Sequence, residues 1–310
     1  MSETDDRAVE LLAFLAERGV EPGAAGKAEA EAFASQLIAD GRNTPEVFEE
    51  LGIWAFRAGH RRLSIALLEL VDCHYALGRL AEVVEADHGP AARTSVFAEP
   101  EPPVGSPESV RCGHALRVAD NLAETIGREA AGRAWFQVQH GITDDEWRGS
   151  DEKDRALFES SGSIDEYLDR KRAARDEFLT RLNAEDRPWY TTAITDEVLA
   201  FILADPEMET PRRDGDTVYV TKVPYRASDY LRAVDETEKR SAACHCPLIR
   251  DAIRDGRAIS PEVCRCSLGH ASHYLAGLGV PLEGEVLESA AKGDLRCRFA
   301  FRLPPRLVPR

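Results

Sequence analysis

The sequence of 310 residues lacks the features of a membrane or secreted protein. It contains no run of about 18 apolar residues, which is the length a helix needs to span a bilayer. Its first residues, MSETDDRAVE, have neither the basic start nor the apolar core of a secretory signal. We therefore expect a cytoplasmic protein, in a compartment where thiols stay reduced.

Positive charge is also scarce. The chain has 39 Lys and Arg against 55 Asp and Glu, which leaves a formal net charge of -16. Such a charge repels nucleic acids and anionic membranes, so we expect neither as a partner. The sequence has no glycine-rich phosphate loop, no GxSxG elbow and no HExxH motif. These absences remove the common signatures of nucleotide-binding proteins, serine hydrolases and metalloproteases.

What is present indicates an α+β fold in two domains. Apolar residues recur at helical spacing over residues 1–88, which predicts an all-helical domain. Residues 89–107 are rich in Pro, Ala and Gly and are typical of a linker. Residues 108–310 are predicted to form an α+β domain with a small antiparallel sheet. If the chain forms a homodimer or binds a protein partner, we expect the contact to use the helical N-terminal domain.

Local patterns place the elements of the second domain. A long helix is predicted from about Ser106 to His140, and ITDDEW at residues 142–147 is a helix-capping pattern. DTVYVTKVPY alternates as a strand does. GEVLESAAKGDLRCRFAFRLP is typical of a hairpin, and its second strand points Cys297 inward with the apolar residues.

Cysteine is infrequent, yet four of the seven cysteines fall close together as two Cys-x-Cys pairs, namely Cys244, Cys246, Cys264 and Cys266. Zinc takes four ligands, commonly thiolates supplied as two close pairs. In an extended Cys-x-Cys the two side chains point to opposite faces, so both can bind one ion only where the chain turns. Otherwise one cysteine of each pair binds, and Cys297 or His245 completes the set. Glu288, on the hairpin strand beside Cys297, is a further candidate ligand.

Other interpretations of the cysteines remain open: an iron–sulfur cluster, a redox dithiol, or buried thiols without a metal. Three residues near the pairs are candidates for catalysis. His270 and His273 share a face of a predicted helix and could extend a metal site or transfer protons. Arg250 could bind a substrate carboxylate or stabilise thiolates.

Two stretches resemble known families. CRCSLGHASHYL, followed by GVPLEGEVLESAAKGDLRCRF, resembles the 4-vinyl-reductase domain, which also serves phenol-sensing bacterial regulators as their ligand-binding part. This resemblance implies an α+β fold, a bound zinc and a small-molecule pocket. The family's metal-site residues would fall on Cys264 or Cys266, Glu288 and Cys297.

The longer stretch from KVPYRASDYL through CHCPLIR to ISPEVCRCSLG resembles an uncharacterised prokaryotic family with a CHCP motif, near the aminothiazoline-carboxylate hydrolases. The likeness extends closely over residues 216–303 and loosely over 108–303. The first Cys-x-Cys pair is additional to the sensor domains, which leaves the ligand set open. The sequence shows no ATPase or DNA-binding module, so we do not expect the regulator role to transfer.

The leading hypothesis is a zinc-thiolate protein whose C-terminal domain binds a small organic molecule. One alternative is a metal-dependent, hydrolase-like enzyme that acts on a small sulfur- or nitrogen-containing substrate. Another is an iron–sulfur or dithiol redox protein. A third is an interaction protein in which the metal only stabilises the fold.

Overall fold

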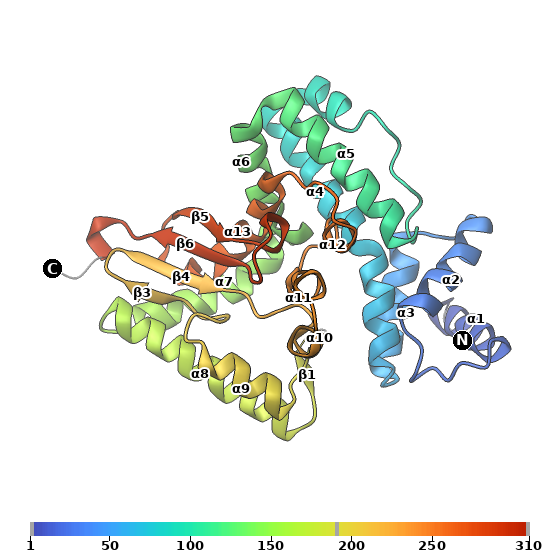
Figure 1. Cartoon of the computed structure of the whole chain (residues 1–310), viewed down its shortest axis with the longest axis horizontal. Coiled ribbons are helices and arrows are strands. Elements are labelled where there is room, and N and C mark those ends of the chain that lie inside the picture. The colour runs from blue at the N-terminus through green and yellow to red at the C-terminus, as the bar shows by residue number, and fades with distance from the viewer. Residues whose placement is uncertain (1–2, 190–191, 308–310) are drawn as a thin grey trace. The chain divides into compact units, whose positions relative to one another are not determined.

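The computed structural model describes residues 3–189 and 192–307 and has the α+β fold that the sequence predicts. The chain divides into two compact units, Met1–Asn121 and Leu122–Arg310, which are called unit 1 and unit 2 below. Figure 1 labels most of the helices and strands of both. In the described residues, no helix is both long enough and apolar enough to cross a membrane.

Unit 1 is helical, as predicted for residues 1–88. Its helices are α1 (Glu3–Glu17), α2 (Lys27–Ala39), α3 (Pro45–Arg57), α4 (Arg61–Val96) and most of α5 (Glu108–Ile126). The apolar faces of α1, α2, α3 and the first part of α4 form one core in which Phe33 and Phe48 are fully buried. The predicted linker 89–107 contains the last turns of α4, after a break at Gly89 with φ 84, and the loop that leads to α5. The division between the units lies after that loop, at Asn121.

Unit 2 begins with helices and continues with the short elements that carry the cysteines. The helices before the main sheet are α6 (Arg128–Val138), α7 (Asp144–Glu159), α8 (Ile164–Ala184) and α9 (Asp196–Ala204), with the 3-10 turn η1 (Gln139–Gly141) between α6 and α7. The later helices are α10 (Ala227–Arg232), α11 (Glu236–Ala243), α12 (Arg250–Arg254) and α13 (Arg265–Ser272). The remaining 3-10 turns are η2 (Pro261–Cys264), η3 (His273–Leu278), η4 (Ala290–Lys292) and η5 (Pro305–Leu307). The single helix predicted over 106–140 is wrong: Gly127, with φ 81, separates α5 from α6.

The main sheet of unit 2 has the order β3-β4-β6-β5 and is antiparallel throughout. Its strands are β3 (Arg212–Asp214), β4 (Thr217–Thr221), β5 (Glu283–Glu288) and β6 (Arg298–Arg302). A separate pair joins β1 (Pro188–Trp189) to β2 (Thr192–Ala193). The predicted hairpin is confirmed as β5–β6, and Cys297 is buried with Phe299 and Phe301. Ala300 is buried too, so the other face of β6 is also partly covered.

Two glycines allow the segments around the second Cys-x-Cys pair to approach the helices before the sheet. A Cβ built on Gly269 of α13 would lie 1.9 Å from the carbonyl oxygen of Phe136 in α6. A Cβ on Gly277 of η3 would lie 2.5 Å from the carbonyl oxygen of Asp154 in α7. Only glycine permits such close contact between backbones. These contacts place α13 and η3 directly against α6 and α7.

Candidate thiol and histidine site

Five of the seven cysteines lie in unit 2, and every one of them is buried with a free thiol. They comprise Cys244 and Cys246 after α11, Cys264 and Cys266 at the junction of η2 with α13, and Cys297 directly before β6. Residues far apart in the sequence therefore contribute thiols to the interior of one unit.

The five thiols are near enough to influence one another electrostatically. Cys244 interacts with Cys264 and Cys297, and Cys246 interacts with Cys264 and Cys266. Burial raises the pKa of every one, to about 12 for Cys264 and Cys266. Without a metal, the thiols therefore stay protonated at neutral pH.

The cysteine sulfur atoms are donors that suit zinc, although the side chains are not arranged around one metal position. Over residues 3–189 and 192–307, no group of three or more His, Cys, Asp or Glu side chains is arranged to hold a metal ion. Buried thiols are nevertheless the donors that zinc binds most readily, once they lose their protons. Zinc binding at these cysteines would have to draw the sulfur atoms closer together and release protons.

The two predicted ligands other than cysteine already have partners. The Nε2 of His245 lies 2.6 Å from the carbonyl oxygen of Val223. Glu288 accepts hydrogen bonds from Arg296 at 2.8 and 2.9 Å, and these hold the pKa of the carboxyl below its ordinary value. His245 could bind a metal through Nδ1, whereas Glu288 would first have to leave Arg296.

The three candidates for catalysis lie in different surroundings. The Nδ1 of His270 is 3.4 Å from the Nζ of Lys222. His273 has both ring nitrogens occupied, because Nδ1 is 3.1 Å from either carboxylate oxygen of Asp151 and Nε2 is 2.9 Å from the Oε1 of Gln139. The guanidinium of Arg250 lies over the ring of Tyr225, 4.3 Å from its centroid. The ring of His270 is therefore next to a buried lysine.

His140, which the sequence analysis did not single out, joins the thiols to the histidines. Its backbone N–H donates to the Sγ of Cys266 at 3.0 Å, and its ring Nε2 is 3.0 Å from the Oγ of Ser267. The ring also lies 5.3 Å from that of His270. His140 has φ 61, a left-handed conformation that is uncommon for a residue with a side chain.

Lys222 and Glu209 were also missed by the sequence analysis. Lys222 directly follows β4 and is 4% exposed. Glu209, with φ 55, accepts a hydrogen bond from the backbone N–H of Val223 at 2.8 Å and another from the hydroxyl of Tyr274. The one available sequence signal was a lysine that interrupts an otherwise apolar strand pattern, TVYVTKV.

Burial away from water is the main cause of the shifted pKa values of His140, His270, Lys222 and Glu209. Burial lowers the pKa of His140 and of His270 well below the ordinary value and also lowers that of Lys222. It raises the pKa of Glu209. Buried ionisable groups whose pKa values are shifted in this way are enriched in functional sites.

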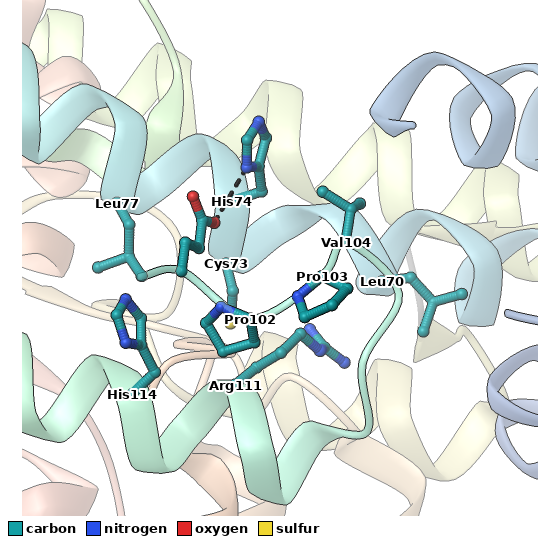
Figure 2. Close-up of a pocket in the computed structure, with 10 residues that line it drawn as sticks. Leu70, Cys73, His74, Leu77, Pro102, Pro103, Val104, Arg111 and His114 are labelled. Carbon is teal, nitrogen blue, oxygen red and sulfur yellow. Dashed lines mark hydrogen bonds and ion pairs between the residues drawn. The ribbon is translucent and has the colours of Figure 1, made fainter. Parts of the chain in front are cut away.

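Unit 1 contains a separate small cavity between α4, α5 and the loop that joins them (Figure 2). Its volume of about 10 Å³ matches a single water molecule. The lining includes Cys73, His114 and the prolines of the loop, and Glu101 of the loop contacts His74 at 3.0 Å. The five thiols of unit 2 take no part in it.

No protein-family model, curated protein or solved structure matches the chain.

Proposed function

We propose that unit 2 holds zinc through cysteine thiolates and binds a small organic molecule beside the metal, in the reducing environment of a cytoplasm. The gathering of five buried, free thiols from separate segments carries this proposal. Thiolate binding to a metal would explain why so many ionisable sulfur atoms are withdrawn from water without disulfides.

The polar side chains next to the thiols support the part of the proposal that concerns the small-molecule ligand. His140, His270 and Tyr274 retain partial exposure although burial dominates the pKa of both histidines. Aromatic and imidazole side chains with a few oriented polar groups are typical of sites for small molecules.

The test is the zinc content of the full-length protein, purified without added metal and measured by elemental analysis. We expect about one zinc per chain. Cys264→Ser should lose most of this zinc and melt at a lower temperature, because zinc binding and folding are coupled. The control is Cys73→Ser, which removes a buried thiol from unit 1 and should keep the zinc.

A zinc-free protein, or full zinc in Cys264→Ser together with full zinc in Cys297→Ser, would contradict the proposal. Iron with sulfide and a broad visible absorption band would instead establish the iron–sulfur alternative.

A second candidate function, a metal-dependent enzyme of the hydrolase type, is favoured by backbone conformation. Gln139, His140 and Glu209 all have positive φ. Strained residues of this kind cluster at active sites, where the surrounding structure holds them in place. If unit 2 hydrolyses small sulfur- or nitrogen-containing compounds, His270→Ala should retain zinc and lose turnover of thioester and amide substrates.

A further inference from the structure

The geometry points to a small carboxylate as the ligand of unit 2, with its charge held by Lys222 at a position bordered by His270 and Trp147. This inference rests on the proposed function, because it names the chemical class of the molecule that would bind beside the thiols.

Lys222 is a buried lysine that forms no ion pair in the described part of the chain. Its one side-chain contact in the described structure joins Nζ to the Nδ1 of His270 at 3.4 Å, and no carboxylate forms an ion pair with it there. Glu209 interacts with Lys222 at longer range, but its two oxygens accept from Val223 and Tyr274. An ammonium group removed from water is costly unless an anion accompanies it.

Trp147 supplies a second donor without an acceptor beside the same histidine. Its ring centroid is 5.1 Å from that of His270, and its Nε1 is buried with no hydrogen-bond partner among the described atoms. The ring is held in place by stacking on His273 at 4.2 Å. The Lys222 ammonium and the Trp147 indole N–H are both next to His270, and each can donate to an oxygen of a carboxylate bound there.

The charge balance favours a carboxylate over a phosphate. Lys222 is the cationic residue whose side chain contacts His270 at this position. One cation matches one negative charge, whereas a phosphate dianion would require more. The competing explanation is that Lys222 neutralises metal-bound thiolates, since Cys244, Cys266 and Cys297 all interact with it.

The experiment compares carboxylates with neutral isosteres on the zinc-loaded, full-length protein by calorimetric titration. The probes are acetate and benzoate, their amides acetamide and benzamide, and inorganic phosphate. We expect a carboxylate to bind better than its amide and better than phosphate. Lys222→Met should weaken carboxylate binding by at least about tenfold, the effect of losing one charged hydrogen bond, with unchanged zinc content.

Two further variants keep the test decisive if Lys222→Met is unstable. Trp147→Phe preserves the stacking ring but removes the indole N–H, so it should weaken carboxylate binding about fivefold. Lys153→Met removes an exposed lysine of α7 and should leave binding unchanged.

Three results would overturn the carboxylate assignment: no binding of either carboxylate, equal binding of acid and amide, or loss of zinc in Lys222→Met, which would make Lys222 the counter-ion of the thiolates. Equal binding of acid and amide would leave the proposed small-molecule site standing. Absence of zinc from the parent protein would instead remove the metal part of the proposed function.

Discussion

At the scale of single residues, His114 of unit 1 is a buried imidazole without a hydrogen-bond partner. It is 2% exposed, and neither ring nitrogen has a partner within the described structure. Figure 2 shows it beside the loop prolines that line the small cavity. Burial lowers the pKa of His114 below its ordinary value of 6.5. A polar ring in this position reduces the stability of unit 1, unless a water molecule in the cavity satisfies it.

From the lowered pKa of His114, we predict that unit 1 loses stability in mild acid. Because its pKa is lower in the folded than in the unfolded chain, the unfolded chain binds more protons below pH about 6.5. Stability is therefore full above that pH and falls as the pH decreases, by at most about 1.4 kcal/mol per pH unit. The loss ends below the folded-state pKa. His114→Leu should reduce this slope and raise the free energy of unfolding by about 1 kcal/mol at neutral pH.

Hydrogen exchange of peptides from α4 and α5, recorded between pH 8 and pH 5 and corrected for the intrinsic rate, measures this effect. Parallel pH profiles for the parent protein and His114→Leu would show that His114 does not control the acid response.

Residue-level features of the site divide into those visible in the sequence and those that are not. The cysteines could be predicted as a group because two pairs stand 17 residues apart and the hairpin pattern turned Cys297 inward. Glu209 and His140 could not, because each is brought to the site by tertiary contacts, and for Lys222 the only signal was a lysine within a strand pattern. A left-handed conformation at His140 or Glu209 is imposed by surrounding structure and leaves no mark in residue type.

At the scale of elements, prediction succeeded where the signal is local. Thr143 accepts the hydrogen bond from the backbone N–H of Glu146, as the capping pattern predicts. The β5–β6 hairpin follows from alternation in one short stretch. Prediction was wrong at Gly127, because apolar spacing continues through a residue whose left-handed conformation ends the helix.

Because α13 lies directly against α6 at Gly269, we expect a single methyl group added there to destabilise unit 2. Gly269→Ala would place its Cβ 1.9 Å from the carbonyl oxygen of Phe136, so the two helices must separate. We expect unit 2 to lose about 1–3 kcal/mol of stability, measured by thermal or urea unfolding. His140, next to the C-terminal end of α6, should then lose its hydrogen bond to Cys266.

The matched control for this prediction is Gly149→Ala in α7. Its Cβ would meet nothing within 4 Å, and alanine favours a helix over glycine, so stability should stay the same or rise by up to about 1 kcal/mol. If Gly269→Ala unfolds at the same temperature as Gly149→Ala and the parent protein, the close helix contact does not contribute to the stability of the fold.

At the scale of the whole molecule, the boundary between the units could not be located from residue composition. Residues 89–107 have the composition of a linker, yet the contact-based division lies after them, at Asn121. Composition reports where a chain can form a loop, but it does not report which core the next helix joins. Cys112, Val118 and Ala119 of α5 are buried, and the division places all three in unit 1.

The proposed metal site lies in unit 2 alone, so metal removal should affect the two units differently. Calorimetric melting of the zinc-loaded, full-length protein should show two transitions, and a chelator should lower only the one that belongs to unit 2. Zinc at 100 times its dissociation constant stabilises a folded unit by about 2.7 kcal/mol. For a unit of this size, that free energy corresponds to a shift of roughly 5–10 °C. Hydrogen exchange on peptides of each unit assigns the transitions. In Cys73→Ser, the chelator should again lower only the transition of unit 2. A chelator that shifts the unit 1 transition, or neither transition, would show that zinc does not hold the thiols of unit 2.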